Sequence, residues 1–387
     1  MAPYDSDSSG GEDNDFTETN VLLGYASTDS NGEEISRLGG RPDWIDPAKA
    51  PSAALARCKV CKDLMVLLLQ LNAELPDRFP GHERRVYIFS CRRKSCRRKE
   101  GSVRAVRGVR ISPDAPSAEA RAAEKKKKEG PKESAAAPAL PKASAQGLGQ
   151  ALFGGSGGGA GGARVNPFAS PSATTRPPSE PWPETSAQPK PYPVRWIADA
   201  EYETINPTPT IGFNTEMLPM DVDDSATGGS GGGKEDKDVF ESSMDNTFQK
   251  FADRVGQNPE QCIRYEFAGQ PLLYTKGDAV GRLLSGGNGG GEGKVKVMTS
   301  SGSGKGGIPK CGNCGAGRVF EVQLTPQAIE ELEEWDGEDG LLEGMEWGTV
   351  IVGVCERDCQ EGGVGVGEAG YVEEWVGVQW EELVVKR

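Results

Sequence analysis

The sequence of 387 residues predicts an α+β protein, mainly β, made of two related zinc-ribbon-like β units with a few short helices and long disordered insertions. Three observations predict this class. Apolar runs of strand length lead into closely spaced cysteines, and the same arrangement of cysteines occurs twice. Many of the 53 glycines and 27 prolines gather in low-complexity stretches, so the folded part is shorter than the chain.

The N-terminal β unit is expected at residues 20–111, after a disordered acidic tail at residues 1–19. Its first strand is expected at VLLGYAS, directly after the tail. The continuous apolar run at residues 64–75 fits a strand or a buried helix equally well by its period. Residues 84–91 alternate and contain β-branched and aromatic side chains, which predicts a strand.

Low-complexity sequence separates this unit from the next. Residues 112–192 are rich in Ala, Lys and Glu, then in Gly and Ser, and finally in Pro. Such a segment buries too little apolar surface to offset the entropy that it loses on ordering. We therefore expect a disordered linker there.

The C-terminal domain is expected at residues 193–387, with flexible loops at about 222–238 and 281–307. PVRWIADAEYE, near its start, predicts a strand. Asn258 and Pro259 predict the start of a short helix. VFEVQL, GTVIVGV and EEWVGVQWEELVV predict three strands, with a short helix between the first two. An amphipathic helix is predicted by apolar side chains that recur every three or four residues: Phe240, Met244, Phe248, Phe251 and Val255.

Eight of the nine cysteines fall into two groups, each a Cys-x2-Cys pair, an apolar stretch and a second close pair. The groups are Cys58, Cys61, Cys91 and Cys96, and Cys311, Cys314, Cys355 and Cys359. A Gly-x-Pro turn precedes each group, at residues 40–42 and 269–271, which indicates an internal repeat. Four thiolates at about 2.3 Å make a closed, tetrahedral zinc site that supplies folding energy and has no open position for catalysis. We therefore predict two structural zinc ions.

The cysteines also admit a second interpretation, in which they are reduced residues that line a core, although their close pairing fits this poorly. His82, the only histidine, is an alternative ligand at the first site, but a surface or loop position suits it better. The ninth cysteine, Cys262, is expected in the core. Basic neighbours of Cys96 are expected to lower the pKa of its thiol and favour the metal-binding thiolate.

Charge is distributed unevenly along a chain whose formal net charge is −14. Residues 91–110 hold nine Lys or Arg, and we call this stretch the basic collar. A weak RNA contact is one hypothesis for it, through Arg92, Arg93, Arg97 and Arg98. Residues 321–387 hold 18 Asp or Glu against 3 Lys or Arg. The second hypothesis is therefore an acidic surface that binds a basic partner. Its candidate residues, which we call the acidic run, are Glu330, Glu331, Glu333, Glu334, Asp336, Glu338 and Asp339.

Several functional classes are disfavoured by the sequence. A single histidine, and the lack of a P-loop, a dinucleotide fingerprint or a G-x-S-x-G motif, argue against an enzyme. The most apolar run is too short to span a membrane. The acidic N-terminus fits neither a signal nor a transit peptide, so we expect a cytoplasmic protein, with nuclear shuttling left open. We also expect a monomer.

Long stretches of the N-terminal β unit and of the C-terminal domain resemble the programmed cell death protein 2 family. The N-terminal strings are LLGYAS, LGGRPDWID, CKVCKDLMVLLLQLNAELPDR, HERRVYIFSCRRKSC and VRAVRG. The C-terminal strings include FQKFADRVGQNPEQCIRYEFAGQPLLY, IPKCGNCGAGRVFEVQLTPQAIEEL, MEWGTVIVGVCERDC and YVEEWVGVQWEE. Metazoan relatives can carry a MYND-type zinc finger between the halves. Here that place holds no cysteine, so the chain is similar to the shorter fungal form, the 20S rRNA accumulation protein four type.

This resemblance implies a function that spacing and composition do not supply. It implies a dedicated chaperone that binds a newly made small-subunit ribosomal protein of the universal S-five type. Such a chaperone supports assembly of the 40S ribosomal subunit and maturation of the 20S pre-rRNA. The alternative that remains is a zinc-knuckle RNA-binding factor that contacts pre-rRNA through the basic collar.

Overall fold

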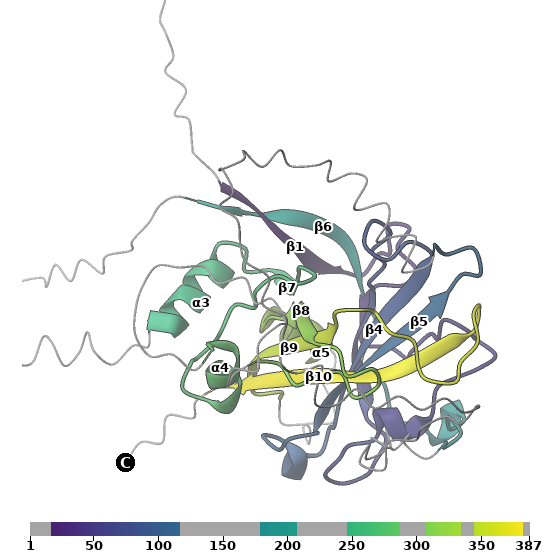
Figure 1. The fold of residues 1–387 in the computed structure, drawn as a ribbon. Coiled ribbons are helices and arrows are strands. Elements are labelled where there is room, and N and C mark those ends of the chain that lie inside the picture. Colours follow the sequence, from purple (N-terminus) through teal and green to yellow (C-terminus); the bar gives the residue numbers. More distant parts are fainter. Residues whose placement is uncertain (1–16, 117–178, 207–245, 287–306, 334–343, 382–387) are drawn as a thin grey trace, which may run out of the picture. The chain divides into compact units, whose positions relative to one another are not determined.

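The computed structural model describes residues 17–116, 179–206, 246–286, 307–333 and 344–381. Ten strands form one closed antiparallel sheet, a barrel, with the order β1-β6-β2-β3-β4-β5-β10-β9-β8-β7 (Figure 1). The strands are β1 (Thr17–Ser27), β2 (Arg37–Leu38), β3 (Val66–Asn72), β4 (His82–Ser90), β5 (Val103–Ile111), β6 (Arg195–Ile205), β7 (Gln261–Tyr265), β8 (Arg318–Leu324), β9 (Trp347–Cys355) and β10 (Ala369–Trp380). The α-helices of the described residues are α3 (Asn246–Gly256), α4 (Ala279–Leu284) and α5 (Gln327–Glu333). The predicted mainly β class is confirmed.

The two halves do not form separate sheets. β1 pairs with both β6 and β7, β2 pairs with β6, and β5 pairs with β10, so strands of each half close the sheet with strands of the other. The order is the same for both halves: if β1–β5 are relabelled as β6–β10, and β6–β10 as β1–β5, every strand keeps its two neighbours in the closed sheet. The zinc-ribbon-like character of each half stays a prediction, because the halves share one barrel.

Equivalent positions of the two halves make the same contacts. The side chain of Gln70, on β3, accepts the backbone N–H of Asp43 at 2.8 Å, and that of Gln323, on β8, accepts the N–H of Leu272 at 3.0 Å. Both glutamines are fully buried. Asp43 and Leu272 each follow the proline of a Gly-x-Pro turn, so each turn is held to the sheet by a buried amide that satisfies a backbone donor.

The apolar core combines strands from both halves. A large cluster contains Leu68 on β3, Ile88 on β4, Val322 on β8 and Val352 on β9, all completely buried. A second cluster lies around the first cysteine group and includes the aromatic side chain of Trp44. The ambiguous run at residues 64–75 is thus resolved as β3, because pairing with β2 and β4 satisfies its backbone groups.

Some predicted elements differ from the structure. The short helix expected at Asn258 and Pro259 is absent from residues 258–265, where a turn leads into β7. β7 pairs with β1 and β8, and these long-range hydrogen bonds override the local helix signal. The flexible loop expected at residues 281–307 is wrong at its start, because residues 281–284 belong to α4. The side chain of Asp278 caps this helix by accepting the backbone N–H of Gly281. The other loop, at residues 222–238, lies outside the described residues.

The predicted linker is also shorter at its C-terminal end. Residues 179–192 belong to the described structure, and the ring of Trp182 meets Trp44 edge-on with centroids 4.7 Å apart. The Glu180 backbone N–H donates to the Ser52 hydroxyl at 3.0 Å. The contact between the rings of Trp182 and Trp44 buries apolar surface, which orders this part of the predicted linker although its composition predicted disorder. Residues 117–178 lie outside the described residues, and no helix of the described part is long and apolar enough to cross a membrane.

Candidate metal centres

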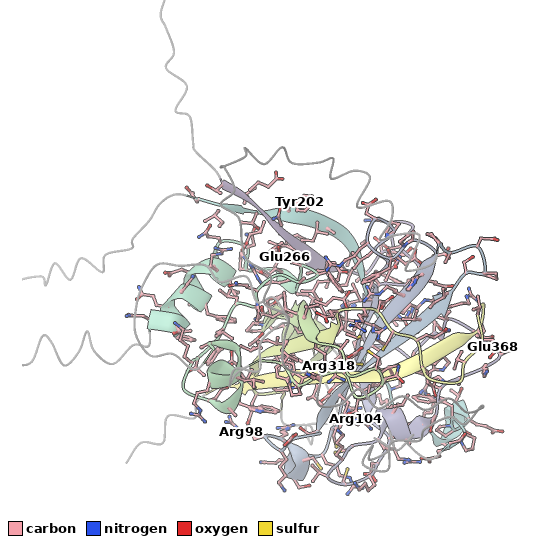
Figure 2. The ribbon with its side chains drawn as sticks, in the orientation of Figure 1. Arg98, Arg104, Tyr202, Glu266, Arg318 and Glu368 are labelled. Atoms are coloured by element: carbon pink, nitrogen blue, oxygen red, sulfur yellow. The ribbon has the colours of Figure 1, made fainter. Side chains whose placement is uncertain are left out.

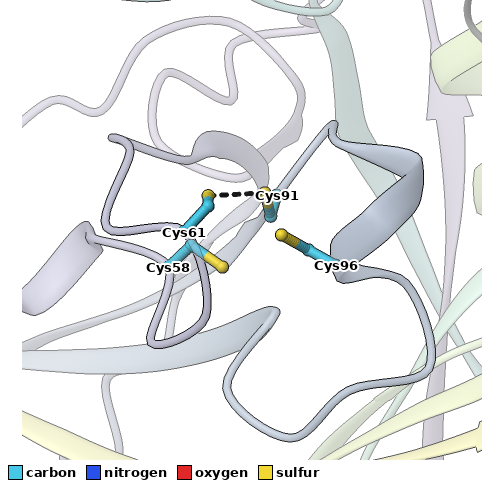
Figure 3. A group of neighbouring side chains, drawn as sticks. All are labelled: Cys58, Cys61, Cys91 and Cys96. Atoms are coloured by element: carbon cyan, nitrogen blue, oxygen red, sulfur yellow. Dashed lines mark hydrogen bonds between the residues drawn. The ribbon is translucent and has the colours of Figure 1, made fainter.

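The first cysteine group lies beside the end of β4 (Figure 3). Cys58 and Cys61 come from the chain that precedes β3, Cys91 follows β4 directly, and Cys96 ends a short 3-10 turn. The four sulfurs lie within 4.8 Å of one another, and the Sγ atoms of Cys61 and Cys91 are 3.6 Å apart. The structure therefore brings together all four predicted ligands.

The second cysteine group repeats this construction. Cys311 and Cys314 precede β8, Cys355 ends β9, and Cys359 lies in the loop before β10. The Sγ–Sγ distances are 3.6 Å between Cys311 and Cys359 and 3.5 Å between Cys314 and Cys355. A regular tetrahedron with metal–sulfur bonds of about 2.3 Å has edges of about 3.8 Å, so both groups fit the size of a zinc site.

The Cys-x2-Cys turns have the same backbone geometry. The N–H of Lys62 donates to the carbonyl of Cys58, and the N–H of Gly315 donates to the carbonyl of Cys311, both at 2.9 Å. Lys62 and Gly315 both have left-handed φ values, 68° and 72°. A left-handed lysine costs about 1–2 kcal/mol, so this geometry is maintained at the first site against local preference.

Local donors favour ionised sulfur in each group. Burial opposes ionisation of Cys58, but the backbone N–H groups of Cys61 and Val60 point to its sulfur and leave its pKa below the ordinary value. The thiols of Cys355 and Cys359 donate to Cys311 and lower its pKa. In the first group burial raises the pKa values of Cys91 and Cys96, and in the second the hydrogen bond with Cys311 raises those of Cys355 and Cys359. One sulfur in each group is therefore favoured as the thiolate, the form that binds a metal.

Cys96 contradicts the expectation drawn from its basic neighbours. Burial raises the pKa of Cys96, and the thiol of Cys61 raises it further. The leading causes are thus desolvation and neighbouring sulfur, rather than the charges of the collar. The expectation was wrong because adjacency in sequence does not bring a guanidinium to the sulfur.

Arginines of the basic collar make contacts within the molecule. The guanidinium of Arg92 lies over the ring of Tyr192 at 4.9 Å, and Arg93 forms an ion pair with Asp63. Arg98 donates to a backbone carbonyl at 2.8 Å. Three more arginines pair with carboxylates of other strands: Arg104, Arg107 and Arg110. Figure 2 labels Arg98 and Arg104, which hold the collar to β10 and its C-terminal end. These contacts favour a structural role for much of the collar.

The acidic run is only partly described. Glu330, on α5, is exposed, whereas Glu331 pairs with Arg195 at 3.3 Å. A side-chain oxygen of Glu333 accepts the backbone N–H of Met345 at 2.7 Å. The other candidates lie outside the described residues: Glu334, Asp336, Glu338 and Asp339.

A buried cluster of charges joins the two halves beside the second cysteine group. Asp358 accepts hydrogen bonds from Arg84 on β4 and Arg107 on β5, both at 2.7 Å. Arg84 also pairs with Glu321 on β8, and Arg107 with Glu374 on β10, both at 2.8 Å. Each of these five side chains is at most 1% exposed. Charges this deep are stable only when they are paired.

His82 belongs to this cluster, which corrects its expected surface or loop position. It lies on β4, is 8% exposed, and its Nδ1 is 2.8 Å from a carboxylate oxygen of Asp358. Arg107 also donates to the backbone carbonyl of Cys359 at 2.9 Å, so the cluster contacts the second cysteine group directly. Sequence reasoning missed this cluster; the available signal was charged residues within apolar strand patterns, as in VFEVQL and VRAVRGVR.

Metal content tests the two centres directly. We expect the purified chain to hold about two zinc ions, because each group offers four converging sulfurs. Elemental analysis after removal of loosely bound metal gives this number. A content well below two zinc ions per chain contradicts the double site.

The fold and the two centres define a class of mainly β proteins with two equivalent halves, each with a four-cysteine group between its strands. The chain belongs to the programmed cell death protein 2 family. Residues 21–112 match the family's N-terminal domain, and residues 245–380 match its C-terminal putative domain.

Two relatives of this family align along nearly the whole chain, and a third along a shorter stretch. Probable 20S rRNA accumulation protein 4 of Schizosaccharomyces pombe (strain 972 / ATCC 24843) is 28% identical, over 95% of this chain and 99% of the relative. Programmed cell death protein 2 of Mus musculus is 25% identical, over 90% of this chain and 91% of the relative. A programmed cell death protein 2-like protein of Gallus gallus is 38% identical over a shorter stretch, 30% of this chain and 24% of the relative. No solved structure matches the chain.

Proposed function

We propose that this chain is a factor of small-subunit ribosome biogenesis that supports maturation of the 20S pre-rRNA. The observation that carries this proposal is the similarity to a protein named as a 20S rRNA accumulation protein, along 95% of this chain. Such full coverage includes both halves of the barrel, so the likeness extends beyond a common metal-binding turn.

The finer proposal is a dedicated chaperone for one basic ribosomal protein of the universal S-five type, acting in the cytoplasm as a monomer. Two closed four-sulfur groups suit a binding scaffold, since such sites stabilise a fold and leave no position for a substrate. This supports a protein that binds and is not an enzyme. The exposed carboxylate of Glu330, with the acidic residues that follow it in sequence, supports a basic client through complementary charge.

The RNA-binding alternative has less support. Arg93 and Arg98 already contact Asp63 and the backbone near the end of β10, so an RNA phosphate would have to compete with these contacts. Aromatic platforms for stacked bases are absent from the collar sequence, residues 91–110. We therefore propose a protein client in preference to pre-rRNA.

A pull-down of the tagged chain from cells in which translation has been halted tests the client proposal. We expect one basic small-subunit ribosomal protein to be enriched, together with the ribosomes that are stalled on its own mRNA. Neutralising five acidic residues at the acidic run is expected to reduce this enrichment about tenfold, because lost charge complementarity slows association. The variant carries Gln or Asn at Glu330, Glu334, Asp336, Glu338 and Asp339.

The matched control removes the same charge from the N-terminal tail, at Asp5, Asp7, Glu12, Asp13 and Asp15. It should leave the enrichment unchanged. Enrichment of pre-rRNA that persists when the ribosomal protein is lost would favour the RNA-binding alternative. Equal losses in both variants would show that net charge, and not the acidic run, attracts the client.

A further inference from the structure

The two metal centres differ in how well their cysteines are covered. Cys314, in the second group, is exposed, whereas the other members of both groups are buried or half-buried. All four cysteines of the first group belong to the aromatic cluster around Trp44 or pack against it. Cys314 lies outside the small apolar cluster of its own centre. The second centre is therefore the one that presents a ligand residue to solvent.

Glycines leave the turn of the second centre open. The first turn reads Cys-Lys-Val-Cys-Lys and the second Cys-Gly-Asn-Cys-Gly, so Gly315 stands where the first turn has Lys62. The ammonium of Lys62 donates to the carbonyl of Lys59 at 2.8 Å, so this side chain folds back along its turn. A Cβ added to Gly312 or Gly315 would meet no atom within 4 Å, which places open space on either side of Cys314 in the second turn.

A second sulfur lies close to that of Cys314. The Sγ atoms of Cys314 and Cys355 are 3.5 Å apart, and Cys355 is completely buried at the end of β9. Because a disulfide bond is about 2.05 Å long, the two sulfurs have to approach by about 1.5 Å to form one. The pair thus combines an exposed cysteine with a buried neighbour that can form a disulfide with it.

Exposure decides which of these two cysteines an oxidant meets first. A thiol that coordinates a metal is deprotonated, so every sulfur of an occupied centre is a thiolate, the nucleophilic form. Among thiolates, susceptibility to oxidation then follows exposure. Since Cys355 is completely buried, Cys314 is the member of the pair that reacts with a dissolved oxidant.

We propose that Cys314 is a modification site for hydrogen peroxide, at which oxidation turns two metal ligands into a Cys314–Cys355 disulfide. The Cys314 thiolate attacks one peroxide oxygen, the O–O bond breaks, and a sulfenic acid and a hydroxide ion form. The Cys355 thiolate then attacks the sulfenic sulfur, the S–S bond forms, and a second hydroxide ion leaves. The two thiolates lose two electrons, the peroxide gains them, and two protons from the solvent convert both hydroxide ions to water.

The modification ends metal binding at this centre, because two of the four ligands of a closed site are lost. Few apolar contacts surround the second centre, so the end of the barrel that it holds should also lose stability. This inference concerns the chain's own metal ligands and does not depend on the proposed chaperone function.

Oxidation of the full-length, zinc-loaded protein with excess hydrogen peroxide tests the proposal. We expect one of the two zinc ions to be released at least about tenfold faster than the other, as followed with a colorimetric zinc indicator. After free thiols are blocked, peptide mass spectrometry should find the Cys314–Cys355 disulfide. Trypsin cleaves after Arg357, which separates Cys355 from Cys359, and fragmentation of the peptide that begins at Cys311 distinguishes its two cysteines.

A matched pair of ligand variants isolates the role of Cys314. Histidine completes a Cys3His zinc site but forms no disulfide, so Cys314→His is expected to keep both zinc ions and to slow the fast release at least about tenfold. Cys61→His makes the same change at the equivalent position of the first centre and should leave the fast release within about twofold. Zinc content before oxidation verifies that each variant is folded and loaded.

Reduction distinguishes a disulfide from irreversible oxidation of the sulfur. A thiol reductant with added zinc should restore the released ion. The proposal is overturned if both ions leave at the same rate, if the disulfide found lies in the first group or omits Cys314, or if reduction does not restore zinc. Fast release from zinc-loaded Cys314→His also overturns it. If this variant fails to hold zinc, the release rates and the disulfide of the wild-type protein decide.

Discussion

Replacement of Cys311 and Cys314 with serine is expected to make most of the chain insoluble. Zinc binding to a structural site is worth about 10–16 kcal/mol, and the whole stability of a domain is about 5–15 kcal/mol. Removing two ligands therefore removes free energy comparable to that of folding. The measurements are the soluble fraction, the zinc content and the thermal unfolding midpoint of the remaining soluble protein.

The second centre should be the more sensitive of the two. The apolar cluster around it consists of Cys311, Ala316 and Cys355, with Cys359 packed against it. The first centre lies in a larger cluster that contains several aromatic side chains. Because few apolar contacts surround the second centre, metal coordination has to hold this end of β8 and β9 together.

Cys262→Ser is the matched control for this experiment. Cys262 is completely buried but lies outside both groups, in the large apolar cluster, and its thiol donates to the backbone carbonyl of Glu260 at 3.7 Å. We expect a loss of about 1–3 kcal/mol from burying a hydroxyl, with soluble protein and two zinc ions retained. If Cys311→Ser with Cys314→Ser gives folded protein with full zinc content, the four-cysteine assignment at this centre is wrong.

The cysteine pairs and the Gly-x-Pro turns could be predicted from sequence because their geometry is local. A Cys-x2-Cys turn closes through a hydrogen bond between residues four apart, as from Lys62 to Cys58, and its spacing survives in the sequence. Strand periodicity likewise marked β4 and β8. These signals require no knowledge of what lies across the barrel.

The closed sheet and its buried charges could not be predicted in this way. Arg107 and Asp358 are 251 residues apart, and no sequence motif near either residue indicates that the two side chains are in contact. Arg107 lies in the collar sequence, for which an RNA contact was one hypothesis, although it is fully buried. The pairing of β5 with distant strands places Arg107 in the interior. The sequence around an arginine does not show whether its guanidinium is buried and paired or exposed to water.

Asp358→Asn is expected to destabilise the protein by about 3–5 kcal/mol, because it removes the charge that Arg84 and Arg107 share in the interior. Asparagine is close in shape and tolerates the left-handed backbone of this position, φ 50°, so the loss reflects charge and not strain. Urea unfolding should show a lower midpoint with an unchanged slope. Zinc content should stay at about two, which separates this effect from loss of the neighbouring metal.

The pH dependence of this loss follows from the pKa of Asp358. Burial opposes ionisation, but Arg107, His82 and Arg84 outweigh it and lower the pKa to about 2. A depressed pKa contributes stability that is present above the unfolded value of about 3.9 and is lost only as pH falls towards the folded value. The stability that the Asp358 charge contributes should therefore be complete above about pH 5, and the difference between wild type and Asp358→Asn should narrow as the pH falls from there towards about 2.

Glu368→Gln is the exposed counterpart. Glu368 pairs with Lys49 at 3.2 Å, but both side chains are more than half exposed, so we expect a loss of about 0–1 kcal/mol. A loss as small as this for Asp358→Asn would mean that water reaches the buried cluster and solvates the freed guanidinium groups. Asp358 would then contribute little to joining the two halves of the barrel, which strand pairing, apolar packing and the pairs Arg84–Glu321 and Arg107–Glu374 would hold together.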